Sequence, residues 1–150
     1  MTRLEHRIRE VVKIFLPRGW RLVEQQFNEE IDGYAHKNTR TIHCIPLKDT
    51  YALFVFLHEV GHIRCGHMRK GHNTPLDDYT DEYEAEMWAI NAMKTCGFRV
   101  TTEMLENARH NVRNAIQIEE EHNERAGVYV AVDKEILKFA YPTTWKDHLL

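Results

Sequence analysis

The segment YALFVFLHEVGHIRCGHM, residues 51–68, carries the most informative pattern in the chain. Its apolar side chains recur at helical spacing and form one stripe, made of Leu53, Phe54, Phe56, Leu57, Val60 and Ile63. His58 and His62 lie outside that stripe, about 40° apart around the helix axis at about 100° per residue. The pattern therefore predicts a helix from about Tyr51 to about Met68 that packs by one side and presents two histidines from another.

His58, Glu59 and His62 form the pattern H-E-x-x-H, in which each residue type has a chemical reason. Two imidazoles on one helix face can each donate a nitrogen to the same cation. The carboxylate of Glu59 lies beside them, where it can reach a water on the metal without being a ligand. Gly61, next to the apolar stripe, permits close approach of another backbone. We expect one catalytic metal ion here, with zinc preferred, although two histidines and a carboxylate also suit non-haem iron.

Turn and cap signals divide the rest of the chain into short elements. Helices are predicted at residues 3–16, about 80–96, about 102–126 and 134–141, strands at 21–27, around Tyr34, at 39–47 and, at a sheet edge, at 128–132, and a loop at 69–78. A helix, then a small antiparallel or mixed sheet, then further helices predicts an α+β fold, a minimal zincin-like domain. With 43% hydrophobic content, residues 1–150 are expected to form a single domain.

Charge and cysteine content argue against nucleic-acid-binding proteins and against a cysteine-based zinc site. The formal net charge is −3, so the chain lacks a strong basic field and direct nucleic-acid binding is not expected. Cys44, Cys65 and Cys96 are widely spaced, which argues against a cysteine-based zinc site and fits a reducing compartment. The charged N-terminus does not read as a secretory signal, and the longest apolar run, residues 51–57, is too short to cross a bilayer. We therefore expect a soluble cytoplasmic protein that does not bind membranes.

A catalytic zinc site needs a third protein ligand and an open position for water. The metzincin pattern, H-E-x-x-H-x-x-G-x-x-H, fails here because Cys65 stands at its glycine and Met68 at its last histidine. His67 is close in sequence, but on a continuing helix it would point about 140° away from His62, towards the apolar side. We interpret His67 as a partly buried histidine, or one that supports a ligand without binding the metal.

The predicted helix at 80–96 offers carboxylates instead. Its core-facing stripe consists of Ala85, Trp88, Ala89, Ala92, Met93 and Cys96. Asp81 and Glu82 fall inside the arc of this stripe, whereas Glu84 falls outside it and is expected to be solvated. Because burying an unpaired carboxylate is costly, we predict that Glu82 is the third metal ligand. Glu86, at the edge of the stripe, can orient one of the ligand histidines through its free ring nitrogen.

Taken together, these motifs resemble the ImmA/IrrE family of metallopeptidases over roughly residues 20–97. The resemblance covers Thr41-Ile42 in a strand before the active helix, the H-E-x-x-H motif, and the run from Glu82 to Ala89, which follows the family pattern E-x-x-A-x-x-F-A. The chain departs from that pattern at Trp88, which replaces a phenylalanine. It also lacks the family's apolar stretch and proline after this run.

The resemblance implies a gluzincin-like site, with His58, His62 and Glu82 on one zinc ion and Glu59 as the general base. It also implies a zinc-dependent endopeptidase that cleaves a protein substrate, typically a helix-turn-helix repressor of a phage or mobile element. Two alternatives stay open: another zincin, such as an SprT-like protease, and a catalytically silent metal-binding domain that only binds a partner. Suitable chemistry for stabilising the oxyanion is carried by Tyr79, Tyr83, His72, Arg109 and His110, and the sequence does not choose among them.

Overall fold

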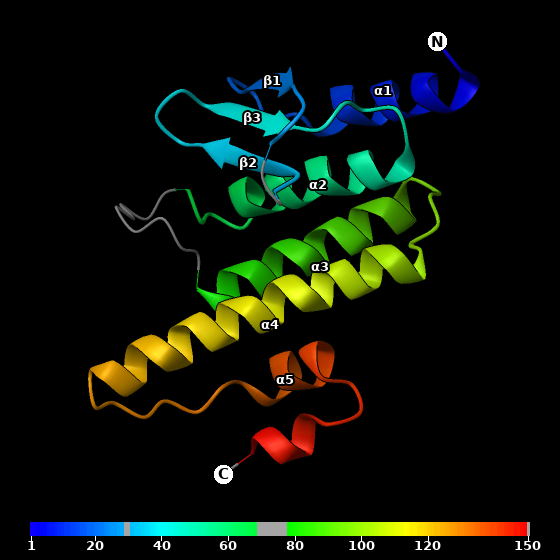
Figure 1. The fold of residues 1–150 in the computed structure, drawn as a ribbon. Helices are drawn as coiled ribbons and strands as arrows, with labels where there is room; N and C mark the ends of the chain where they lie inside the picture. The colour runs from blue at the N-terminus through cyan, green and yellow to red at the C-terminus, as the bar shows by residue number, and fades with distance from the viewer. Residues whose placement is uncertain (29–30, 69–77, 150) are drawn as a thin grey trace. The chain divides into compact units, whose positions relative to one another are not determined.

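The computed structural model describes residues 1–28, 31–68 and 78–149. Over these residues the chain is an α+β structure with a three-stranded mixed sheet (Figure 1). The elements in chain order are α1 (Arg3–Phe15), β1 (Arg21–Glu24), β2 (Gly33–His36), β3 (Thr41–Cys44), α2 (Thr50–Arg64), α3 (Tyr79–Thr95), α4 (Thr102–Arg125), α5 (Lys134–Ala140) and the 3-10 helix η1 (Trp145–His148). The predicted α+β class is confirmed. Most of the predicted loop at 69–78 lies outside the described residues.

Helices begin where polar side chains cap them. The side chain of Thr2 accepts a hydrogen bond from a backbone N–H of the first turn of α1, and Thr101 does the same for α4. Asp49 caps α2 by accepting from the backbone N–H of Ala52, at 2.9 Å. Asp133 caps α5 in the same way. Each cap satisfies N–H groups that have no partner within their own helix, which is why these residues fix the helix starts.

The sheet has the strand order β1-β3-β2. β1 pairs with β3 in parallel, with Arg21 opposite Thr41, and β2 pairs with β3 in antiparallel fashion, with Tyr34 opposite His43. The central strand is also the most buried, and its residue Ile42 is fully buried. Since α2 follows β3 after a short connection, the central strand delivers the chain directly to the helix that carries the H-E-x-x-H motif.

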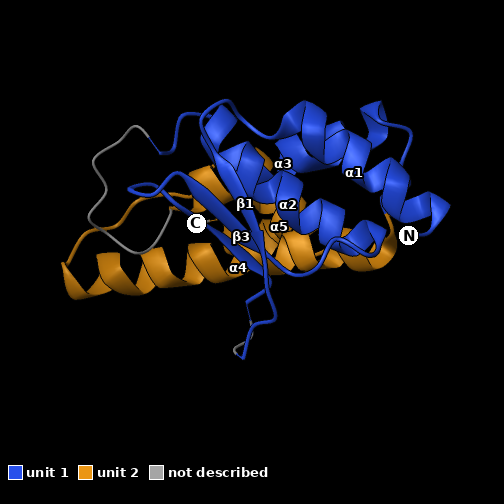
Figure 2. Ribbon diagram, turned by 90° about the horizontal axis from the view of Figure 1, so that it is seen from above, with its two compact units in different colours: residues 1–71, 84–100 blue, residues 72–83, 101–150 orange. Residues whose placement is uncertain are grey.

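The chain divides into two compact units, coloured separately in Figure 2. The first comprises Met1–Gly71 and Glu84–Val100, and the second comprises His72–Tyr83 and Thr101–Leu150. The division passes through α3, which is one continuous helix from Tyr79 to Thr95. The expectation of a single domain over residues 1–150 stays a prediction.

The core of the first unit is built around α2, which contacts α1, β2 and β3. Its apolar stripe is buried as predicted, apart from Ile63, which is half-buried. Hydrogen bonds to the carboxylate of Glu24 connect three segments at the edge of this unit. The guanidinium of Arg9 donates two hydrogen bonds, of 2.6 and 2.8 Å, to the carboxylate of Glu24, which also accepts the backbone N–H of Leu47 at 2.8 Å. Three segments, α1, β1 and the connection after β3, are thereby joined at one side chain.

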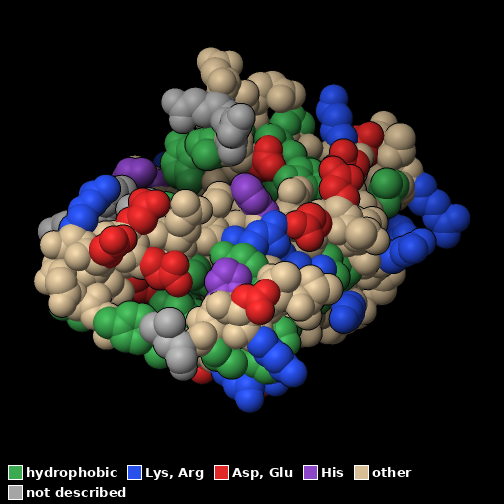
Figure 3. Space-filling view, turned by 60° about the horizontal axis from the view of Figure 1, so that its bottom comes forward, with side chains coloured by type: hydrophobic (Ala, Val, Ile, Leu, Met, Phe, Trp, Pro, Cys, Tyr) green, Lys and Arg blue, Asp and Glu red, His purple; other side chains and the backbone are tan. Residues whose placement is uncertain are grey.

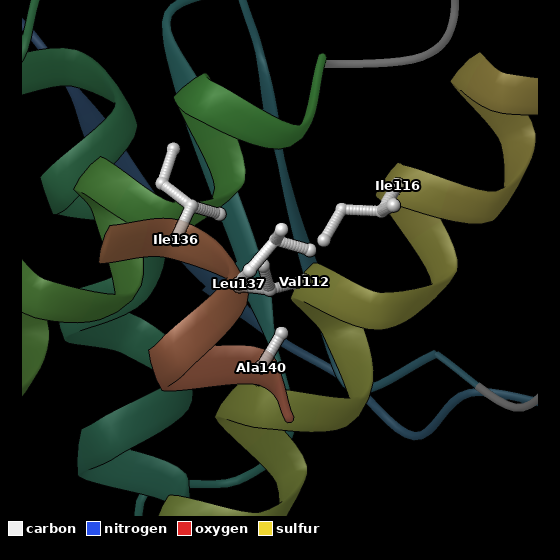
Figure 4. Close-up of a cluster of buried hydrophobic side chains, with 5 residues drawn as sticks. All are labelled: Val112, Ile116, Ile136, Leu137 and Ala140. Carbon is white, nitrogen blue, oxygen red and sulfur yellow. The ribbon is translucent and has the colours of Figure 1, made fainter. Parts of the chain in front are cut away.

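The second unit has its own apolar cluster between α4 and α5. Figure 4 shows its five buried members, which are Val112 and Ile116 of α4 and Ile136, Leu137 and Ala140 of α5. The predicted edge strand at 128–132 is wrong, because this segment carries no strand. Its β-branched composition suggested a strand, but Val128, Tyr129 and Val130 are all exposed, so the segment lacks the buried face that stabilises a strand.

Within the described part of the chain, none of the helices is both long and apolar enough to cross a bilayer. Basic and acidic side chains both occur on the face drawn in Figure 3, which agrees with a formal net charge close to zero.

Candidate metal centre

The helix α2 places His58 and His62 one turn apart, on its face away from the apolar stripe. Their Nε2 atoms are 3.1 Å apart, and their rings are nearly perpendicular, at 89°. His62 is buried, and the side chain of His58 is only 12% exposed. One nitrogen of each imidazole therefore points to the same place, so the two rings can share a cation.

Close packing between α2 and α3 brings a carboxylate to the same place. A Cβ atom at Gly61 would lie 2.8 Å from the carbonyl oxygen and 3.1 Å from the Cα of Ala85, so the two helices touch where the glycine has no side chain. Glu82 lies one turn before Ala85 on α3. Ligand atoms of His58, His62 and Glu82 all lie within 4.8 Å of one another. The closeness that the sequence predicted for these three residues is confirmed.

This donor set fits a metal ion. Two nitrogens that each lie about 2.0–2.1 Å from one tetrahedral zinc are about 3.3 Å apart, close to the 3.1 Å between the two Nε2 atoms. Imidazole nitrogen and carboxylate oxygen are ligands for several divalent metals. His58, His62 and Glu82 could therefore hold one metal ion, and three protein ligands leave a coordination position for water or substrate.

The other ring nitrogen of each of these two histidines also lies close to a polar side chain. The Nδ1 atom of His58 lies 2.9 Å from Oε1 of Glu86, which is 1% exposed. The sequence predicted that Glu86 would contact one of the two histidines, and this contact is present. The Nδ1 atom of His62 lies 2.9 Å from Nδ1 of His67, which is also buried. Such partners fix ring orientation in metal sites.

Glu59 lies beside the three candidate ligands without being one of them. Its side chain is buried, and Oε1 is 4.0 Å from Nε2 of His58. Burial, and to a smaller extent the charges of Glu24 and Glu59, raise the pKa of the Cys44 thiol to about 12. Cys44 is fully buried and packs as a small apolar residue of the core.

The structure corrects the prediction for His67. We expected α2 to run to about Met68 and His67 to point towards the apolar side, but the helix ends at Arg64. Gly66, with φ of 83°, turns the chain back, and the ring of His67 meets that of His62. The angle was wrong because it was extrapolated through a glycine that ends the helix, and this glycine was the signal available in the sequence.

Glu84 is exposed, as predicted, but its Oε2 lies 3.7 Å from Nε2 of His67, which the sequence did not suggest. Ligand atoms of Cys65, His67 and Glu84 also lie within 4.8 Å of one another. The chain thus carries a second group with metal-ligand chemistry, which shares no residue with the first.

The candidates for oxyanion stabilisation mostly have structural roles. Tyr79 and Tyr83 pack against the apolar cluster of the second unit, and the Nε–H of Arg109 donates to the carbonyl of Phe139. His110 is exposed and lies 3.1 Å from the amide nitrogen of Asn114. His72 lies outside the described residues.

Comparison of the chain with protein-family models, with curated proteins and with solved structures finds no match.

Proposed function

We propose that this chain is a zinc-dependent metalloendopeptidase. One observation carries the proposal: ring nitrogens of His58 and His62 and a carboxylate oxygen of Glu82 are close enough to share a metal ion, beside the buried carboxylate of Glu59. Two histidines and a carboxylate with an adjacent acid are the residues of zinc hydrolase sites. A purely structural site would not need Glu59. The likeness of these motifs to the ImmA/IrrE family supports the same function.

In this mechanism a zinc ion held by the three ligands would polarise the scissile carbonyl and lower the pKa of a water molecule at its open position. Glu59 acts as the general base: its carboxylate accepts a proton from the attacking water and donates it to the nitrogen of the leaving amine. Because Glu59 is buried, this exchange occurs away from bulk water. Glu86 keeps the ring of His58 in the orientation that directs Nε2 to the site.

The proposed substrate is a protein, and by the family resemblance a helix-turn-helix repressor of a phage or mobile element. The peptidase would meet this repressor in the cytoplasm and act on it without itself binding nucleic acid or a membrane. A formal net charge of −3 supports a protein substrate over a nucleic acid.

The test takes as its candidate substrate the product of the gene next to that of this chain, because the family resemblance implies that the repressor is encoded there. The zinc-loaded protein should cleave it, a chelator should stop cleavage, and added zinc should restore it. Glu59→Gln should retain zinc but lose turnover by about 10²- to 10⁴-fold, because the base is lost and the ligands are kept. Glu103→Gln, which changes an exposed carboxylate of α4, serves as the control with unchanged turnover.

Cleavage by Glu59→Gln at the wild-type rate would contradict the mechanism. Zinc binding and substrate binding without any cleavage would instead favour the catalytically silent binding domain.

A further inference from the structure

The helix α2 ends in a Schellman motif, in which the chain turns back over the last helical turn. The backbone N–H of His67 donates to the carbonyl of His62 at 3.0 Å, and that of Gly66 donates to Ile63 at 3.2 Å. Gly66 has the positive φ that this motif requires. The motif places the residue after the glycine over the residue five positions earlier, and here these two residues are His67 and His62.

This pair usually makes an apolar contact. The end of α3 in the same chain follows that rule. Its N–H of Phe98 donates to the carbonyl of Met93, around Gly97 with φ of 77°, and both side chains are buried and apolar. At the end of α2 the same two positions hold two buried imidazoles whose Nδ1 atoms are 2.9 Å apart. A polar pair thus replaces the apolar one beside the candidate metal ligands.

When each ring is neutral it carries one proton, and the hydrogen bond between the rings links the position of one proton to that of the other. A neutral imidazole has one N–H, and the nitrogen that binds a metal must be the other one. The Nε2 atom of His62 faces His58, so a metal-binding His62 carries its proton on Nδ1 and donates it to Nδ1 of His67. His67 must then carry its own proton on Nε2, which lies 3.7 Å from the carboxylate of Glu84.

We infer that His67 and Glu84 are positioning residues that hold His62 as the tautomer whose Nε2 is open to the metal. This inference rests on the proposed metal site and adds a role for two residues that are not ligands of it. His67 accepts the Nδ1 proton of His62, and Glu84 attracts the Nε2 proton of His67. His67 thus faces Nδ1 of His62 in the way that Glu86 faces Nδ1 of His58, where the carboxylate oxygen lies 2.9 Å away.

The proton on Nε2 of His67 also determines whether Cys65, His67 and Glu84 can bind a metal. A metal on Nε2 of His67 would have to displace the proton that this nitrogen carries when His62 binds a metal. The two groups are therefore alternatives, and one zinc ion per chain is expected at saturation. Cys65→Ser separates the two readings, because it removes a ligand of the second group and touches neither ring of the hydrogen-bonded pair.

Zinc alone is the probe, and its dissociation constant is measured by competition with a chromophoric chelator. His67→Leu should weaken zinc binding by about 10- to 100-fold, as loss of a hydrogen-bond partner of a ligand does. His67→Asn should restore most of the affinity, because the oxygen of asparagine can stand where Nδ1 stands. Cys65→Ser should leave the affinity unchanged, and Glu84→Gln should fall between wild type and His67→Leu.

A spectroscopic readout tests the tautomer itself. In zinc-loaded protein labelled with ¹⁵N-histidine, His62 should show a protonated Nδ1 in the wild type and in His67→Asn. If His67→Leu does not fold, His67→Gln replaces it, since the oxygen of glutamine can reach the position of Nε2 but not that of Nδ1.

Equal zinc affinity in wild type, His67→Leu and His67→Gln would overturn the positioning role while leaving the proposed site intact. A large loss in Cys65→Ser would overturn it in favour of a metal on the second group. A wild-type chain without zinc affinity would overturn the proposed site and this inference together.

Discussion

Gly61 of α2 and Ala85 of α3 meet backbone to backbone, so closely that a methyl group on Gly61 would lie 2.8 Å from the carbonyl oxygen of Ala85. This contact lies next to His62 in sequence on one helix and one turn from Glu82 on the other. It therefore sets the spacing of the two helices that carry the candidate ligands. The glycine between the glutamate and the second histidine of the motif thus has a physical reason, because a side chain at this position would push the backbone of α3 away from α2.

Gly61→Ala should lower both stability and metal affinity. The added methyl group meets backbone atoms that cannot rotate away, and such overpacking costs about 1–3 kcal/mol of unfolding free energy. Urea unfolding measures the first effect and chelator competition the second. Gly97→Ala is the control, since its positive φ costs about 1 kcal/mol but open space surrounds it, so its zinc affinity should not change. Equal zinc affinity in the two variants would contradict the role of the contact.

The ligand assignment predicts one zinc ion per chain, and alanine at His58, His62 or Glu82 should each remove most of it. Elemental analysis of the purified variants measures this directly. Glu103→Ala is matched to Glu82→Ala, because both residues are acids in the first turn of a helix, and it should keep its zinc. Full zinc retention in Glu82→Ala would mean that the third ligand lies elsewhere.

Glu86 should matter for the metal and not for the fold. Glu86→Leu removes the carboxylate that lies 2.9 Å from Nδ1 of His58. Zinc affinity should therefore fall by about 10- to 100-fold, and that of Glu86→Gln should lie between wild type and Glu86→Leu. If the carboxylate serves only the metal, the melting temperature of the metal-free Glu86→Leu variant should not decrease. A clear loss of metal-free stability in Glu86→Leu would show that the carboxylate is needed for folding.

The link between Arg9 and Glu24 predicts how stability depends on pH. The hydrogen bond from Arg9 lowers the pKa of Glu24 below its usual 4.5, and the N–H of Leu47 acts in the same direction. The stabilisation is therefore present above pH 4.5 and is lost as the pH falls through the lowered pKa. Glu24→Gln should cost about 1 kcal/mol near neutral pH, allowing for solvent screening. Urea unfolding at neutral and acidic pH should show this difference shrinking with acid, and a constant difference would contradict it.

The sequence predicted those features of the candidate site that depend on helix periodicity. His58 and His62 share a face because they are four residues apart on one continuous helix. Glu82 was placed on the inner face of α3 by the same periodicity, and its closeness to both histidines is confirmed. Ala85 was predicted to be buried and Gly61 to allow close approach, and they turned out to contact each other.

Features that depend on where a helix ends were harder to predict. The direction of His67 was extrapolated along a helix that in fact stops at Arg64, and the carboxylate of Glu84 gained a neighbour only because His67 folds back. The segment 128–132 was predicted from composition, although pairing with another strand decides whether a strand forms. A backbone reversal and a pairing partner are both tertiary facts, and residue spacing alone does not contain them.

The turn after α2 also limits which changes of length this part of the chain tolerates. Exposed turns commonly accept inserted residues. Here the backbone hydrogen bonds of Gly66 and His67 allow four residues between the two imidazoles, and one more or one fewer would separate the rings. The motif of this site is therefore longer than H-E-x-x-H. Written as H-E-x-x-H-x-x-x-G-H, it gives a fixed-length signature by which the same histidine pair can be sought in other sequences.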